Sequence, residues 1–142
     1  MKKYRVGYTQ GVFDMFHVGH LNLLKKAKER CDFLIVGVNS DELVETYKHK
    51  CPMINENQRK QIVEAIKYVD KCAIVDTLDK EIAWENFKFD AIFIGDDWKG
   101  NERWVKTEKL LSLHNVKVIY LEYTKGISST ILKEKLEKDI KL

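Results

Sequence analysis

The stretch YRVGYTQGVFDMFHVGHLNLLKKAKER, residues 4–30, indicates most directly how this chain folds. Residues 4–9 are typical of a strand, and a turn that contains Gly11 follows them. Residues 17–30 carry apolar side chains at helical spacing: Leu21, Leu24 and Ala27. We therefore expect a strand, a tight turn and an amphipathic helix in direct succession.

The rest of the chain repeats this alternation. Strand-like runs cover residues 33–38, 72–75, 90–94 and 116–121. Helix-like segments cover residues 55–69, 80–87, 102–113 and 129–138. Strands that alternate with helices favour parallel pairing, with helices on both faces of the sheet. The sequence thus predicts an α/β fold, a Rossmann-like three-layer sandwich with a five-stranded mostly parallel sheet, in which residues 1–142 form a single domain.

The helix that follows Asn55 is predicted in more detail. Asn55 has the character of an N-cap, and Gln58 three residues later completes a capping box. We expect one buried stripe along this helix, formed by Ile62, Ala65, Ile66 and Val69.

Composition excludes several classes of protein. The 25 Lys and Arg against 22 Asp and Glu leave a net charge of +3, too small for the dense basic footprint of a nucleic-acid binder. No apolar run approaches the roughly 20 residues that a membrane helix needs. The widely spaced Cys31, Cys51 and Cys72 argue against a disulfide framework and favour a reducing cytoplasm.

His17 and His20 stand at the predicted start of the first helix, three residues apart, so both imidazoles can face one site. Gly19 between them lets a ligand approach the backbone, and a helix N-terminus favours phosphate. Two other interpretations are surface histidines in a turn and two ligands of a metal ion. A metal site needs a third ligand, and His49 and His114 are isolated.

Four segments resemble, in order along the chain, signatures of the cytidylyltransferase family of nucleotidyltransferases. Residues 17–20, HVGH, are similar to its H-x-G-H; residues 67–70, KYVD, to R-Y-V-D; and residues 123–130, YTKGISST, to R-T-E-G-I-S-T-T. Residues 95–100, GDDWKG, resemble the G-D-D-W-x-G of glycerol-3-phosphate cytidylyltransferases in particular. The resemblance covers nearly the whole chain.

The resemblance implies transfer of CMP from CTP to a small alcohol phosphate, most simply glycerol 3-phosphate, giving CDP-glycerol and pyrophosphate. It assigns catalysis to His17, His20 and Lys50. Nucleotide-binding residues would be Val12, Phe13, His17, Val18, Gly19, His20, Lys50, Asp97, Tyr123, Thr124, Lys125, Gly126, Ile127, Ser128, Ser129 and Thr130. Residues on the acceptor would be Asp14, Lys48, Arg59, Lys80 and Trp98.

Elementary chemistry supports part of this assignment. Residues 126–130 open the last predicted helix, which supplies a second N-terminus and hydroxyl donors for phosphate. Asp14 could orient a histidine or bind a substrate hydroxyl, and Asp97 follows a strand at the edge where such sheets bind ligands. Trp98 is placed either to cover a small substrate or to pack on the domain.

Two positions depart from the family pattern. Lys67 and Tyr123 stand where the family has arginine, so one bidentate fork and one positive charge are lost. Lys125, where the family has glutamate, restores a charge nearby. The phosphate contacts are therefore redistributed, or the acceptor differs from glycerol phosphate.

Several alternatives stay open at this point. The acceptor could be glycerol 2-phosphate, a longer polyol phosphate or phosphoethanolamine, and an adenylyl transferase shares the histidine motif. A non-catalytic nucleotide-binding or regulatory relative is a further possibility, and a flavodoxin-like carrier would share the fold but not explain the histidine pair. We expect Mg²⁺ to accompany CTP, with few protein ligands, and the resemblance implies a homodimer.

Overall fold

The chain folds around one parallel sheet of five strands in the order β3-β2-β1-β4-β5. The computed structural model describes residues 3–122 and 129–140, and it describes side chains for residues 3–122 and 131–138. The strands are β1 Tyr4–Gly11, β2 Cys31–Asn39, β3 Lys71–Val75, β4 Ala91–Gly95 and β5 Lys117–Leu121. The helices are α1 Val18–Glu29, α2 Asp41–Lys48, α3 Glu56–Glu64, α4 Lys80–Phe87, the short 3₁₀ turn η1 Asp96–Trp98, α5 Glu102–Ser112 and α6 Ser129–Ile140.

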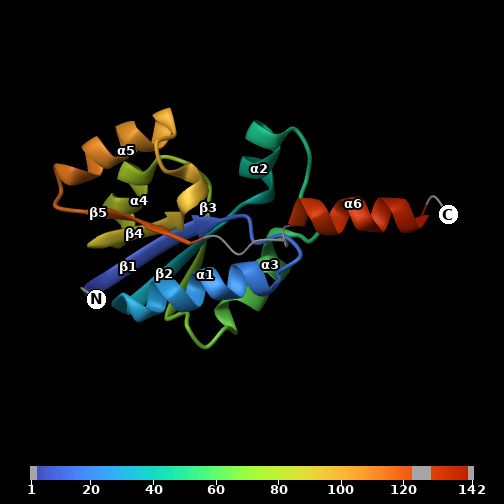
Figure 1. Cartoon of the computed structure of the whole chain (residues 1–142), viewed down its shortest axis with the longest axis horizontal. Coiled ribbons are helices and arrows are strands. Elements are labelled where there is room, and N and C mark those ends of the chain that lie inside the picture. Colours follow the sequence, from blue (N-terminus) through green and yellow to red (C-terminus); the bar gives the residue numbers. More distant parts are fainter. Residues whose placement is uncertain (1–2, 123–128, 141–142) are drawn as a thin grey trace.

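Helices cover both faces of the sheet, as Figure 1 shows, with α1 and α3 on one face and α4 and α5 on the other. The alternation of side chains along β2 separates the two cores: Leu34 and Val36 pack toward α1, while Ile35 packs toward α4 and α5. The predicted Rossmann-like three-layer sandwich is confirmed, and every strand pair in it is parallel.

The strand order places β1 at the centre. The chain leaves β1 for β2 on one side and later returns to β4 on the other, so the topological switch point lies between β1 and β4. In open parallel sheets the crevice beyond the carboxyl ends of the strands, at such a point, is where ligands bind. The fold therefore directs attention to the loops that follow Gly11 and Gly95.

The predicted stripe of α3 is wrong in detail. The helix ends at Glu64, so Ala65 caps it and is exposed, while Ile62 keeps 40% of its surface accessible. The buried positions are Arg59 and Val63, one turn apart. The Asn55 cap is confirmed, since its side chain accepts a hydrogen bond from the backbone N–H of Gln58 at 3.0 Å.

Ile66 and Val69 still pack against the core, but from the turns after the helix. Asp70 anchors that turn, because its carboxylate accepts hydrogen bonds from the backbone N–H of Leu34 at 2.7 Å and from Lys28. Within residues 3–122 and 129–140, no helix is both long and apolar enough to cross a membrane.

Candidate functional site

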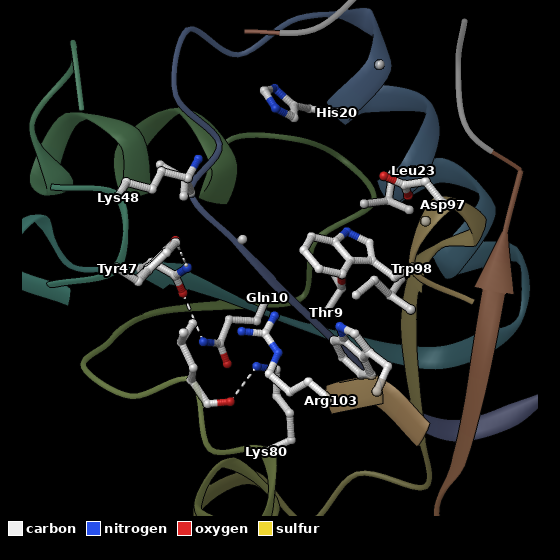
Figure 2. Close-up of a pocket in the computed structure, with 18 of the residues that line it drawn as sticks. Thr9, Gln10, His20, Leu23, Tyr47, Lys48, Lys80, Asp97, Trp98 and Arg103 are labelled. Atoms are coloured by element: carbon white, nitrogen blue, oxygen red, sulfur yellow. Dashed lines mark hydrogen bonds between the residues drawn. The ribbon is translucent and has the colours of Figure 1, made fainter. Parts of the chain in front are cut away.

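A cavity of about 490 Å³ opens at the carboxyl edge of the sheet, and Figure 2 shows the side chains that line it. The ends of β1, β2 and β4 contribute Gln10, Asn39 and Gly95. A second hollow of about 570 Å³ adjoins it along Gly11, His20 and Lys48, toward α6. The cavity thus lies where the strand pattern predicts a ligand site.

The histidine pair stands at one end of this cavity, and a local exchange of hydrogen bonds fixes both rings. Nδ1 of His17 accepts the backbone N–H of Gly19 at 3.0 Å, and Nδ1 of His20 accepts the backbone N–H of His17 at 3.2 Å. The rings stack with their centroids 3.9 Å apart. This is a capping box built from two histidines, and it leaves Nε2 of each ring to carry the proton.

Both imidazoles are held in the neutral form. Burial lowers the pKa of His17, and burial together with the adjacent His17 lowers the pKa of His20 to about 4, although Asp14 opposes the second shift. At neutral pH each ring is therefore an uncharged N–H donor. Nε2 of His17 is buried and has no partner among the described residues, so a ligand oxygen would satisfy it.

The turn that precedes the pair is strained. Phe13 and Met15 take positive φ angles of 54° and 49°, which non-glycine residues rarely adopt. The Phe13 ring is buried in the core and lies edge-on to His20, with centroids 5.4 Å apart. A Cβ on Gly11 would lie 3.2 Å from that ring, so the glycine makes room for it. Packing of the Phe13 ring in the core thus helps to hold the turn in this conformation.

Among the described residues, five lysine or arginine side chains line the two hollows: Lys48, Lys50, Lys80, Arg103 and Lys133. Lys48 lines both, Lys50 lines the one toward α6, and Lys80 and Arg103 lie at the far end of the cavity from His20 (Figure 2). Burial and the positive charge of Arg103 lower the pKa of Lys80 to about 8, against the effect of Asp79. Burial and the neighbouring lysines also lower the pKa of Lys48. Positive charge therefore faces the cavity from Lys48 on one side and from Lys80 and Arg103 at the far end.

Asp14 lies beneath the histidine end and is only 3% exposed. Its carboxylate accepts the backbone N–H groups of Met53 and Ile54 at 2.8 and 3.0 Å, and Lys133 of α6 pairs with it at 2.7 Å. Burial alone would raise the pKa of Asp14, but these partners outweigh it and leave the pKa below its usual value. Asp14 thereby links the turn after β1 to the backbone at Met53 and Ile54 and to α6.

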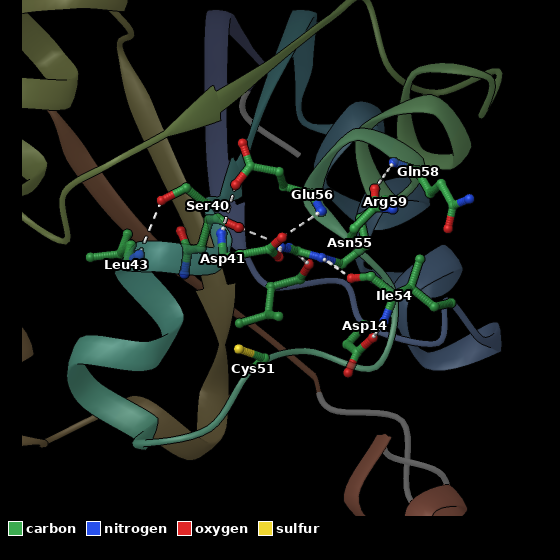
Figure 3. Close-up of polar contacts among 12 residues, drawn as sticks. Asp14, Ser40, Asp41, Leu43, Cys51, Ile54, Asn55, Glu56, Gln58 and Arg59 are labelled. Atoms are coloured by element: carbon green, nitrogen blue, oxygen red, sulfur yellow. Dashed lines mark hydrogen bonds and ion pairs between the residues drawn. The ribbon is translucent and has the colours of Figure 1, made fainter.

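Arg59 is placed differently from the sequence prediction, which assigned it to the acceptor. Its side chain is 1% exposed and lines neither hollow. Figure 3 shows the guanidinium at the centre of a network, where it donates to the carbonyls of Val12, Asn39 and Ile54 and pairs with Asp41 at 2.6 Å. Its N–H groups donate to three backbone carbonyls and to Asp41, so Arg59 positions the loops after β1 and β2.

Other predicted residues divide between cavity and surroundings. Val12, Gly19, Asp97 and Trp98 line the cavity. Val18 is 53% exposed and lines neither hollow.

The predictions for residues 123–128 fall outside the described residues: Tyr123, Thr124, Lys125, Gly126, Ile127 and Ser128. The side chains of Ser129 and Thr130 fall outside them too, although α6 begins at Ser129 as expected.

Some cavity residues were not found from the sequence. Tyr47, Asn39 and Gln10 line one side, and Arg103 and Trp104 line the far end, where Nε1 of Trp104 is buried without a partner among the described residues. The only available signal was their position just after a strand or in the helix that follows. Among the described residues, no group of three or more His, Cys, Asp or Glu side chains is arranged to hold a metal ion.

Comparison with known proteins identifies the family. Residues 8–135 match the cytidylyltransferase-like family. The chain belongs to the cytidylyltransferase-like family. It is 38% identical over 129 residues to a glycerol-3-phosphate cytidylyltransferase of Staphylococcus aureus, covering 90% of this chain and 92% of that one. It is also 41% identical over 99 residues to an FAD synthase of Archaeoglobus fulgidus, covering 69% and 70% of the two chains.

A solved structure has the same fold. The lipopolysaccharide core biosynthesis protein of Thermoplasma volcanium superimposes with a TM-score of 0.74 at 28% identity, over 86% of this chain and 99% of that one. The protein is thus a cytidylyltransferase-like nucleotidyltransferase, and this family membership implies a nucleoside triphosphate substrate.

Proposed function

We propose that this protein transfers CMP from CTP to a small alcohol phosphate, with glycerol 3-phosphate as the first candidate. The observation that carries the proposal is the pair of neutral imidazoles at the N-terminus of α1, which line a cavity together with Lys48, Lys80 and Arg103. The likeness to glycerol-3-phosphate cytidylyltransferases over nine-tenths of the chain supports the choice of donor and acceptor.

The chemistry would need positioning and charge stabilisation more than a base. A phosphate oxygen of the acceptor, already ionised at pH 7, attacks the α-phosphorus of CTP. The bond from that phosphorus to the bridging oxygen breaks, and pyrophosphate leaves. Donors aimed at the developing charge are the main source of acceleration in such a step. His17 and His20 would supply these donors, while Lys48 and Lys50 offset the repulsion between the two anions.

Mg²⁺ is expected to arrive with the triphosphate and to shield the charge of the leaving pyrophosphate. The imidazoles and lysines here are phosphate ligands, whereas Mg²⁺ prefers oxygen ligands and retains water. Asp97 and Glu122 are the carboxylates that line the cavity and offer such oxygens. A cytoplasmic location and a homodimer stay predictions.

The test is pyrophosphate release, with each of the four nucleoside triphosphates crossed against glycerol 3-phosphate, glycerol 2-phosphate, a longer polyol phosphate and phosphoethanolamine. We expect turnover with CTP and glycerol 3-phosphate. The likeness to an FAD synthase makes ATP the important competitor, and turnover with ATP but not CTP would overturn the proposal. Tight CTP binding without any turnover would instead indicate a non-catalytic nucleotide-binding protein.

A further inference from the structure

A chain of hydrogen-bonded polar side chains, buried at Tyr8 and Asn39 and half-buried at Gln10 and Tyr47, runs from the sheet to one side of the cavity. The hydroxyl of Tyr8 donates to Oε1 of Gln10 at 2.6 Å, and Nε2 of Gln10 donates to Oδ1 of Asn39 at 2.9 Å. Nδ2 of Asn39 then donates to the hydroxyl oxygen of Tyr47 at 3.1 Å. Tyr8 is fully buried, and a Cβ on residue 37 would lie 2.4 Å from its hydroxyl, so Gly37 leaves the space in which this chain begins.

We call these side chains the Tyr8–Gln10–Asn39 relay. The direction of each hydrogen bond in the relay follows from one backbone carbonyl. Nε2 of Gln10 also donates to the carbonyl oxygen of Thr77 at 2.9 Å, and a carbonyl can only accept. The amide of Gln10 is therefore fixed, with its nitrogen toward Thr77 and Asn39. Asn39 must present its oxygen to that nitrogen, which turns its own nitrogen toward Tyr47. The hydroxyl oxygen of Tyr47 consequently accepts.

The relay has a chemical consequence at its end. Because one lone pair of the Tyr47 oxygen is taken by Asn39, the hydroxyl hydrogen remains to be donated elsewhere. It has no acceptor among the residues that the structure describes, and Tyr47 lines the cavity (Figure 2). Tyr47 is thus oriented as a hydrogen-bond donor, and its partner must be an oxygen or nitrogen with a free lone pair.

The position of Tyr47 indicates which substrate it meets. The histidines lie at the start of α1, which follows β1, and Asp97 lies in η1, which follows β4. The switch point between these strands is where the nucleotide is expected. Tyr47 follows β2, on the other side of β1, and Lys80 follows β3. Together with Arg103, these residues place hydrogen-bond donors along the remainder of the cavity, which suits an oxygen-rich anion.

We propose that the Tyr47 hydroxyl, oriented by the Tyr8–Gln10–Asn39 relay, binds an oxygen of the acceptor alcohol phosphate and helps to select it. The proposal rests on the proposed function, because it assumes an acceptor beside the nucleotide. Tyr47 is a binding residue in this scheme, and Asn39 is a positioning residue that acts through Tyr47.

The test compares Tyr47→Phe with the wild-type protein. We expect the KM for glycerol 3-phosphate to rise about tenfold, as for the loss of one hydrogen bond to a charged or hydroxyl oxygen, with the KM for CTP unchanged. Tyr120→Phe is the matched control, since it removes a hydroxyl that bonds Glu108 outside the cavity, and it should change neither KM. Calorimetric CTP binding to each variant verifies that it is folded.

A double-mutant cycle tests the relay. Asn39→Ala should raise the acceptor KM in the wild-type background and add little in the Tyr47→Phe background, whereas a merely structural role of Asn39 would give additive losses and a lower kcat. Repeating the cycle with propyl phosphate identifies the bound oxygen: a penalty kept with propyl phosphate assigns it to the phosphate, and a penalty lost assigns it to a hydroxyl.

Three results would overturn the inference. An unchanged acceptor KM in Tyr47→Phe refutes it while leaving the proposed function intact, because the wild-type protein still turns over. A rise in the KM for CTP alone assigns Tyr47 to the nucleotide instead. A wild-type protein that releases pyrophosphate with no substrate pair refutes the proposed function, and the role of Tyr47 falls with it.

Discussion

The two ends of the cavity are built in different ways. At one end, His17 and His20 cap the same helix and hold each other through hydrogen bonds that span four residues. At the other end, Tyr47, Lys80 and Arg103 come from three helices, and Tyr47 is oriented through Gln10 and Asn39, which lie far apart in the sequence. The histidine pair is therefore oriented by hydrogen bonds within one short segment, whereas Tyr47 is oriented by hydrogen bonds that form only when distant segments meet.

Removing one imidazole should have the largest effect. His20→Ala is expected to lower kcat by about 10²–10³-fold, because a donor to the developing charge is lost, while CTP binding changes little. Steady-state pyrophosphate release and CTP calorimetry measure the two quantities. His114→Ala is the control, since His114 stacks on Trp84 outside the cavity, and it should leave kcat unchanged. Equal losses in kcat and CTP affinity would contradict the local, transition-state role.

Arg59→Met tests whether the loops around the histidine end depend on a buried support. We expect a loss of about 3 kcal/mol in the free energy of unfolding, since three carbonyls and Asp41 lose their partner. Arg103→Met, at the opposite end and exposed, should cost less than about 0.5 kcal/mol. Urea unfolding measures the free energy of unfolding of both variants. Similar losses in the two would contradict a special structural role of Arg59.

Lys80 should make binding of the acceptor depend on pH. Its lowered pKa of about 8 means that it is charged below pH 8 and neutral above it, so acceptor binding should weaken as the pH rises from 7 to 9.5. Lys80→Met should raise the acceptor KM about tenfold at pH 7, as for a lost charged hydrogen bond. Lys80→Arg should flatten the pH profile. A KM that is independent of pH in the wild-type protein would contradict this assignment.

The smallest effect is expected where α6 meets the histidine end. Lys133→Met should cost about 1 kcal/mol of stability at pH 7, because the partly buried pair with Asp14 is lost. The pKa of Asp14 is lowered, so this contribution is present above the ordinary aspartate range and is lost as the pH falls through the folded pKa. Urea unfolding of both proteins should therefore converge in acid. A difference that persists there would indicate packing rather than charge.

The fold was largely predictable because its signals are local. Apolar spacing placed every strand and the four main covering helices, and Asn55 marked a helix start that the structure confirms. The stripe predicted after Asn55 failed because periodicity does not reveal where a helix stops. Ile66 and Val69 are apolar and buried in part, but they reach the core from turns.

The candidate site was predictable at the histidine pair and, through the family resemblance, at several residues of other segments. His17, Gly19 and His20 face the cavity as expected, and Lys48 and Lys80 line it too. Arg59 was misassigned because a cation at a helix start is equally suited to a phosphate and to backbone carbonyls. Only its burial and its four partners distinguish these roles.

The sequence by itself determined the alternation of strands and helices, the histidine cap and the family. These depend on spacing over a few residues, which is readable along the chain. The tertiary structure alone decided that Tyr47 is a donor. That property depends on the side-chain amides of Gln10 and Asn39, near the ends of β1 and β2, and on the carbonyl of Thr77 in the loop after β3. These groups meet only when the sheet forms. Hydrogen-bond direction is a property of the assembled network, so no single segment contains it.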